Sequence, residues 1–153
     1  AMFYLLPLIW LDRYDPEPIW LLALAFAWGA LVSVIVSFII NTAVGIGVGS
    51  IDQNLGMIAG AVISAPVVEE ASKGLGLILL LIFFRREFDD ILDGIVYAGV
   101  IALGFATVEN VLYYGRGIAA GGAGGLIVLF VLRGILSPFA HVTFTAMTGI
   151  GCG

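Results

Sequence analysis

Apolar residues form long, nearly uninterrupted runs along the chain, and short polar segments separate them. Long runs cover residues 19–40, 55–84, 91–114 and 126–153, and a shorter one covers residues 3–11. A transmembrane helix needs about 20 predominantly apolar residues, so each long run can cross a bilayer. The pattern predicts an all-α, polytopic transmembrane helical bundle with about five spans, in which residues 3–11 are the end of a helix or an interfacial anchor.

The segments between the runs predict loops. Residues 12–18 contain Pro16 and Pro18, which lack backbone donors and restrict the residue before them, so a turn is expected. Residues 41–54 contain three alternating glycines, a spacing also found in phosphate-binding loops. Without a preceding strand or a following lysine, a loop at the membrane edge is the better interpretation. The glycine-rich residues 115–125 are expected to be flexible or partly re-entrant.

The run over residues 55–84 is too long for a simple span. As one helix it would be about 45 Å long, whereas the hydrocarbon core is about 30 Å thick. Pro66 is the expected break. A kink there would free a carbonyl about one turn earlier and could aim a neighbouring glutamate away from the lipid.

The arginines predict the orientation. Counting spans places the 12–18 and 85–90 loops on one side of the membrane. That side holds Arg13, Arg85 and Arg86, and the other holds Arg116. The positive-inside rule therefore predicts a cytoplasmic 85–90 loop in a multi-pass protein of a prokaryotic plasma membrane.

The composition supports one membrane domain over residues 1–153. Hydrophobic residues make up 61% of the chain and charged residues only 11%, which is typical of an integral membrane protein in contact with the lipid bilayer. The net charge of -5 argues against nucleic-acid binding, which needs clustered Lys and Arg. Cys152 is the only cysteine, so no internal disulfide is possible. The start at Ala1 and the apolar end of the chain predict truncation at one or both ends.

Three ionisable residues lie inside the apolar run 55–84: Glu69, Glu70 and Lys73. A charged side chain in the middle of a bilayer costs about 2.5–3.5 kcal/mol on insertion scales, so three together indicate function. On a helix either glutamate can pair with Lys73. Because consecutive helical residues diverge by about 100°, one glutamate is expected to pair with Lys73 while its neighbour faces a cavity. A buried ion pair that only fixes helix packing is the alternative.

Further polar residues fall in the other predicted spans, namely Glu109, Asn110, Arg133, His141 and Thr145. A glutamate can take a proton from water, and a histidine can bind a metal or donate to a leaving group. Asn110 is expected to help hold a tetrahedral oxyanion. Arg133 is expected to be structural, paired with a carboxylate or extended to the interface.

The same residues are compatible with a metal. Glu69, Glu70, Glu109 and His141 form a plausible zinc set, since catalytic zinc keeps three protein ligands and one open position. The chain has no HExxH pair and a single histidine, so chemistry driven by carboxylates without a metal stays open.

Straight helices would not bring these groups to one depth. Glu70 would lie about 22 Å and Glu109 about 27 Å from the cytoplasmic side, and His141 about 22 Å from the outer side. A shared site therefore requires helix tilt, a re-entrant 115–125 segment or shifted helix ends.

Three motifs together resemble the PrsW family of intramembrane proteases. They are EExxK at residues 69–73, FxxxEN at residues 105–110 and HxxFTxxxG at residues 141–149. The resemblance extends over nearly the whole chain, and the family is distantly related to the CAAX prenyl endopeptidases and the bacteriocin-processing enzymes.

The resemblance implies an intramembrane endopeptidase that cuts a membrane-anchored protein, such as an anti-sigma factor in a stress response. It places Glu69, Glu70 and His141 at essential positions and Glu109 with Asn110 in the second motif. Lys73 and Thr145 are expected to support the site. In the CAAX branch the polar residue four positions after the histidine is often Asn; here it is Thr145, which favours carboxylate-driven chemistry.

Two other functions fit the same residues. A proton-coupled transporter or channel could use buried Glu, Lys and His as a relay, although no internal repeat relates two halves of the chain. A non-catalytic membrane chaperone or receptor on a degenerate protease fold would tolerate loss of Glu69 and Glu70.

Overall fold

The computed structural model describes residues 2–13, 16–88, 90–119 and 130–152. All regular secondary structure of these residues is helical, and consecutive helical elements join into five stretches. The first consists of η1 (Met2–Tyr4) and α1 (Leu5–Asp12). This short stretch agrees with the predicted helix end at residues 3–11.

The second stretch is one helix where the sequence predicts a helix and a loop. It comprises α2 (Ile19–Ala27), the π-helical η2 (Trp28–Ser33) and α3 (Val34–Gly49). The predicted 41–54 loop is therefore wrong. Only residues 50–52 turn the chain, and the Asp52 carboxylate caps α4 by accepting from the backbone N–H groups of Asn54 and Leu55, at 2.8 and 3.0 Å.

The glycines around this turn are packing residues. A Cβ atom at Gly56 would overlap the backbone of Gly49 and the carbonyl oxygen of Gly45. Small residues let two membrane helices approach closely. The alternating glycines thus serve a tight helical hairpin.

The third stretch passes through Pro66 without a break. It comprises α4 (Gln53–Ile58), the π-helical η3 (Ala59–Ser64) and α5 (Ala65–Phe83). The predicted break at Pro66 is wrong because the widened π-helical turn directly before the proline accommodates its missing N–H donor within a continuous helix.

The fourth and fifth stretches close the bundle. A short 3-10 turn, η4 (Arg85–Glu87), leads to α6 (Ile91–Ala119). Residues 115–119 are therefore helical, and the prediction of a flexible or re-entrant segment is wrong there. Residues 120–129, which include the rest of that segment and the start of the last predicted span, lie outside the described part of the chain. The last stretch is the π-helical η5 (Phe130–Leu136) followed by α8 (Ser137–Ile150).

Helix α6 lies at the centre of the molecule and packs against α1, α2, η2 and α8. A Cβ atom at Gly104 would overlap the Phe26 carbonyl oxygen, and one at Gly149 would overlap the Gly94 carbonyl oxygen. The backbones therefore touch on both sides of α6. The core around it is aliphatic and aromatic, with the buried residues Leu8, Leu21, Ala25, Leu77, Leu80, Tyr97, Ala98, Val100, Ile101 and Leu103.

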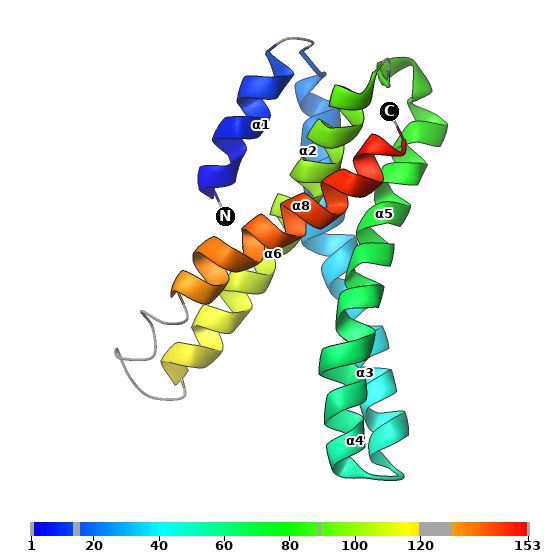
Figure 1. Ribbon diagram of the computed structural model, residues 1–153, viewed down its shortest axis with the longest axis vertical. Coiled ribbons are helices and arrows are strands. Elements are labelled where there is room, and N and C mark those ends of the chain that lie inside the picture. The colour runs from blue at the N-terminus through cyan, green and yellow to red at the C-terminus, as the bar shows by residue number, and fades with distance from the viewer. Residues whose placement is uncertain (1, 14–15, 89, 120–129, 153) are drawn as a thin grey trace.

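Two limbs extend from this core (Figure 1). One limb contains α3, α4 and the first half of α5, and the other contains the C-terminal part of α6 with η5 and the start of α8. Residues 12–13, 16–18 and 85–88 lie at the same end of the molecule, away from the tips of the limbs, as their predicted common side requires.

The helices fit a membrane. Three of them are long and apolar enough to cross a bilayer, over Ile19–Gly49, Ile91–Ile118 and Phe130–Ile150. The stretch from α4 to α5 is equally long but carries the charged residues Glu69, Glu70 and Lys73 near its middle. The chain is an all-α membrane protein, as predicted.

Candidate active site

The adjacent glutamates of α5 have different surroundings. Glu70 Oε1 accepts a hydrogen bond from Lys73 Nζ at 2.5 Å, and Glu70 Oε2 accepts one from Thr145 Oγ1 at 2.9 Å. The Glu69 carboxylate makes no hydrogen bond or ion pair with any residue that the structure describes. The predicted division is confirmed: Glu70 pairs with Lys73, and Glu69 faces a cavity.

Lys73 also fixes the histidine. Its side chain is fully buried, and its Nζ lies 2.8 Å from His141 Nδ1 and 4.3 Å from the centre of the Phe105 ring. An ammonium can only donate, so Nδ1 accepts and Nε2 carries the hydrogen. That Nε2 lies 3.3 Å from Glu109 Oε2, to which it donates.

Glu109 has a second partner. Arg133 Nη1 donates to Glu109 Oε1 at 3.0 Å, and the guanidinium lies 3.5 Å from the centre of the Tyr113 ring. The prediction that Arg133 pairs with a carboxylate is confirmed. Arg133 thus connects η5 to the middle of α6.

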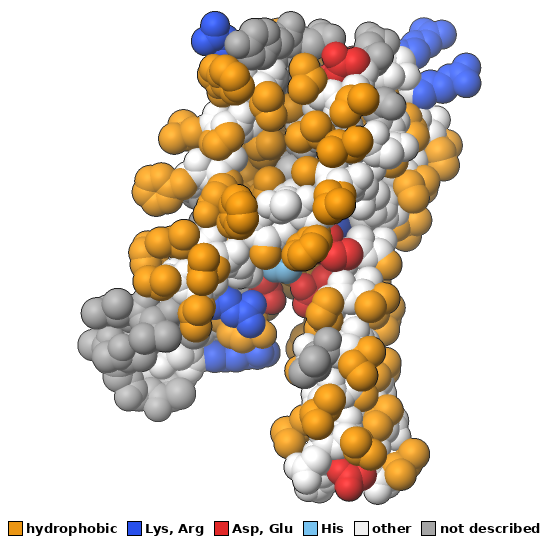
Figure 2. All heavy atoms as spheres, in the orientation of Figure 1, with side chains coloured by type: hydrophobic (Ala, Val, Ile, Leu, Met, Phe, Trp, Pro, Cys, Tyr) orange, Lys and Arg blue, Asp and Glu red, His pale blue; other side chains and the backbone are white. Residues whose placement is uncertain are grey.

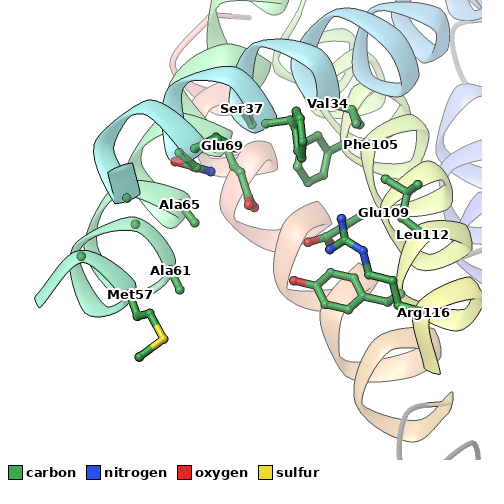
Figure 3. A pocket seen from close by; sticks show the side chains of 17 residues that line it. Val34, Ser37, Met57, Ala61, Ala65, Glu69, Phe105, Glu109, Leu112 and Arg116 are labelled. Carbon is green, nitrogen blue, oxygen red and sulfur yellow. The ribbon is translucent and has the colours of Figure 1, made fainter. Parts of the chain in front are cut away.

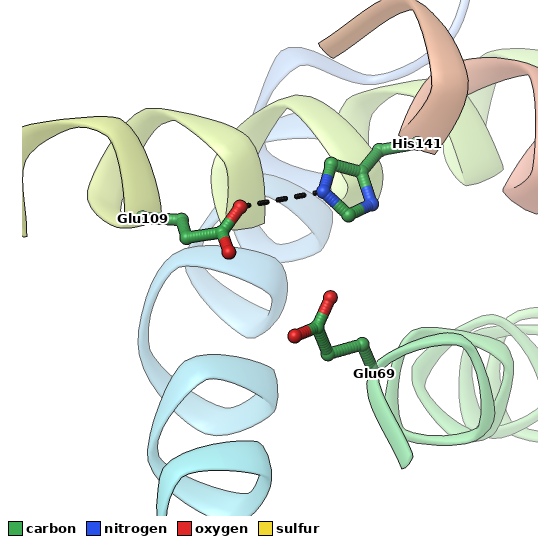
Figure 4. Close-up of side chains that lie close together, drawn as sticks. All are labelled: Glu69, Glu109 and His141. Carbon is green, nitrogen blue, oxygen red and sulfur yellow. Dashed lines mark hydrogen bonds and ion pairs between the residues drawn. The ribbon is translucent and has the colours of Figure 1, made fainter. Parts of the chain in front are cut away.

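Glu69, Glu109 and His141 come together from three helices (Figure 4). One ligand atom from each lies within 4.8 Å of the other two. The predicted mismatch in depth does not occur, because α6 and α8 run obliquely to α5 (Figure 1) and several helices extend beyond their predicted ends. Glu70 is not part of this group, since Lys73 and Thr145 occupy its oxygens.

Glu69 and Glu109 of this group line the inner end of a cleft between the two limbs, and His141 lies beside them. The cleft has a volume of about 510 Å³, and Figure 2 shows acidic side chains and the histidine gathered where the limbs meet. Glu69 and Glu109 face each other across it (Figure 3). Its walls are otherwise mostly small or apolar residues of α3, α4, η3, α5 and α6, including Val34, Gly45, Gly60, Ala61, Ala65 and Leu112.

A short chain of hydrogen bonds supports the turn that carries Glu69. Ser72 Oγ donates to the Glu69 carbonyl oxygen at 2.9 Å and lies 3.3 Å from Ser37 Oγ. Trp28 Nε1 donates to the Ser72 carbonyl oxygen at 3.0 Å. Nothing in the sequence links Ser37 or Trp28 to the site. In the sequence, Tyr113 is recognisable only as part of an apolar run, and Phe105 only as the first residue of the FxxxEN motif.

Asn110 does not join the group. It lines a separate cavity of about 600 Å³ together with Tyr114, and its Oδ1 has no hydrogen-bond partner among the described residues. The rotation of about 100° per residue that separates Glu69 from Glu70 also separates Asn110 from Glu109. The predicted oxyanion role of Asn110 therefore has no geometric support in this arrangement.

Comparison with known proteins identifies the family. Residues 17–153 match the model of the PrsW family of intramembrane metalloproteases. The chain belongs to the PrsW family. This agrees with the three motifs, whose residues Glu69, Glu109 and His141 lie close together.

Curated relatives named Protease PrsW are similar over most of the chain. The protein of Geobacillus kaustophilus is 30% identical over 142 residues, which cover 93% of this chain and 57% of the relative. The Clostridioides difficile protein is 35% identical over 141 residues, 90% of this chain and 55% of the relative. The Oceanobacillus iheyensis protein is 35% identical over 149 residues, 97% of this chain and 63% of the relative.

The chain thus spans between 55% and 63% of the length of these relatives. No solved structure matches it.

The donor set suits the metal that the family description implies. One imidazole and two carboxylates are ligands that zinc accepts in catalytic sites, with a fourth position open for water. The three groups come from different helices and already lie within 4.8 Å of one another. Glu69 and Glu109 would be ligands together with Nε2 of His141, which would first have to lose its hydrogen. In the other tautomer that hydrogen is on Nδ1, which lies 3.5 Å from Glu70 Oε1.

Proposed function

We propose that this chain is the catalytic domain of a membrane-embedded endopeptidase that hydrolyses a peptide bond in a membrane-anchored protein. The observation that carries the proposal is the meeting of Glu69, Glu109 and His141 beside a cleft between membrane helices, which the two glutamates line. Membership of the PrsW family supports protease chemistry over the transporter alternative.

Glu69 is the residue that activates water. Its carboxylate faces the cleft and makes no hydrogen bond or ion pair within the described residues, so it can accept a proton from a water molecule bound there. Glu70 is excluded from this role because Lys73 and Thr145 hold both of its oxygens. Its function is to position His141 through Lys73.

His141 and Glu109 complete the site. Nε2 of His141 carries a hydrogen toward Glu109 at 3.3 Å, and this N–H can instead donate to the developing oxyanion or to the leaving nitrogen of a substrate. Arg133 holds the other oxygen of Glu109, which keeps that carboxylate in place when the N–H turns away.

A zinc ion, bound by Glu69, Glu109 and His141, would supply a Lewis acid and an activated water. The apolar walls of the cleft would favour hydrolysis with or without zinc, because a low dielectric strengthens interactions with the charge that develops in the transition state.

The substrate is a membrane-anchored segment that enters the cleft from the bilayer. By family resemblance an anti-sigma factor is the expected class, and the host membrane is a prokaryotic plasma membrane with the 85–90 loop in the cytoplasm.

The test is cleavage of a single-pass reporter by purified protein in liposomes. Glu69→Gln keeps the size of the side chain but removes the base, so kcat should fall by about 10²–10⁴-fold, the usual contribution of general base catalysis. Glu87→Gln, in η4 outside the cleft, is the matched control and should cleave like the parent.

A folded Glu69→Gln protein that cuts the reporter as fast as the parent contradicts the proposal. Proton flux into the same liposomes, lost in Glu70→Gln while no reporter is cleaved, would favour the transporter alternative.

A further inference from the structure

Arg116 is a cation of the cleft without an acidic partner. It lines the same cleft as Glu69 and Glu109 and is exposed there. It forms no hydrogen bond or ion pair with a described residue. Residues 120–129, which follow α6, contain no Asp or Glu and so offer no side-chain carboxylate. Arg133, by contrast, is held by Glu109 and Tyr113.

The position of Arg116 relates it to the reaction site. It follows Glu109 by seven residues on α6, which is about two turns or 10 Å and returns to nearly the same helix face. Figure 3 shows both side chains on the cleft wall, with the Arg116 guanidinium directed back along α6 toward Glu109. An extended peptide advances about 3.3 Å per residue. A group bound by Arg116 would therefore lie within about three residues of a bond held at Glu109.

We propose that Arg116 is a specificity residue that binds an acidic side chain of the substrate within three residues of the cleaved bond. This inference rests on the proposed protease function. The planar guanidinium can bind a carboxylate through two parallel hydrogen bonds, and the apolar walls of the cleft strengthen such a pair.

Lipid phosphate is the other anion within reach of an arginine near a helix end. The location of Arg116 favours the substrate, because its side chain lies along the cleft with Leu112 and Tyr113 rather than on the outer surface of the bundle. A substrate bound in the cleft would therefore contact the Arg116 guanidinium, whereas a lipid headgroup outside the cleft would not.

The experiment uses matched single-pass reporters that carry Asp, Asn or Lys at each of the three positions on either side of the cleaved bond. For the parent protein, kcat/KM should be at least about tenfold higher with Asp than with Lys at one position, which corresponds to about 1.4 kcal/mol. Arg116→Glu should invert that preference. Arg86→Glu, at the opposite end of the molecule, should keep it.

Two results would overturn the inference. The parent could cleave all reporters without a charge preference, or Arg116→Glu could change cleavage of all reporters by the same factor. An equal loss that depends on anionic lipid in the liposomes would assign Arg116 to a lipid phosphate. If the parent cleaves none of the reporters, the proposed function fails and this inference fails with it; cleavage that Glu69→Gln abolishes, without charge preference, removes this inference alone.

Discussion

At the scale of single residues, the site is organised by one buried ammonium. Lys73 is fully buried in a membrane helix, yet it contacts the Glu70 carboxylate, His141 Nδ1 and the face of the Phe105 ring. These contacts replace the water that the charge would otherwise need. The cluster therefore joins α5, α6 and α8 as well as orienting the histidine.

Replacing Lys73 with Met should destabilise the protein. The change leaves Glu70 without its charged partner, and a hydrogen bond to a charged group contributes about 1.5–3 kcal/mol. The free energy of unfolding in detergent micelles should fall by that amount. The double variant Lys73→Met with Glu70→Gln should recover part of the loss, because no unpaired carboxylate remains; strictly additive losses would show that the two residues do not interact.

At the scale of helices, small residues decide how closely neighbouring elements approach. Gly45, Gly49 and Gly56 bring α3 and α4 into backbone contact, and Gly45, Gly56 and Gly60 form part of the cleft wall. The shape of the cleft thus depends on residues that carry no chemistry. Larger side chains there would push α3 and α4 apart.

The substitution Gly56→Ala should therefore lower stability and reduce reporter cleavage together. Its Cβ would overlap the Gly49 backbone. Gly47→Ala is the control on the same hairpin, since a Cβ at Gly47 meets nothing within 4 Å. Alanine is favoured over glycine in helices by about 1 kcal/mol, so this variant should be as stable as the parent or more so. Thermal unfolding curves that rank the two variants in the opposite order would contradict the packing argument.

At the scale of the whole molecule, two limbs enclose a polar site, and the charged turn η4 lies at the end of the molecule away from the tips of the limbs (Figure 1). Residues 12–13, 16–18 and 85–88 share one end, and the turn at residues 50–52 lies at the other (Figure 1). This arrangement fixes the relative sides of the loops. The positive-inside rule then predicts that the 85–90 loop lies in the cytoplasm.

Labelling in intact cells checks that assignment. In a Cys152→Ser background, Ser50→Cys should react with a membrane-impermeant maleimide from outside. Arg86→Cys should react only after the cells are permeabilised. The reverse pattern of labelling would mean that the molecule is inserted the other way round, while leaving the fold unchanged.

Much of the architecture could be predicted because hydropathy and helix periodicity are local properties. Runs of about 20 apolar residues mark membrane helices, and the rotation of about 100° per residue separates Glu69 from Glu70 before any neighbour is considered. The errors were local as well. The glycines near the turn and Pro66 each predicted an interruption of a helix. The predictions failed because the packing of these glycines and the π-helical turn at η3 depend on neighbouring backbone, which the local sequence does not specify.

The sequence by itself determined that this protein is a helical membrane bundle and that its buried Glu, Lys and His residues require a shared polar site, because unpaired charge is costly in lipid. Only the tertiary structure decided which of them meet. The oblique course of α6 and α8 brings Glu109 and His141 to Glu69, while Asn110 faces another cavity and Arg133 joins Glu109. Helix crossing is set by contacts between residues distant in sequence, and no local pattern encodes it.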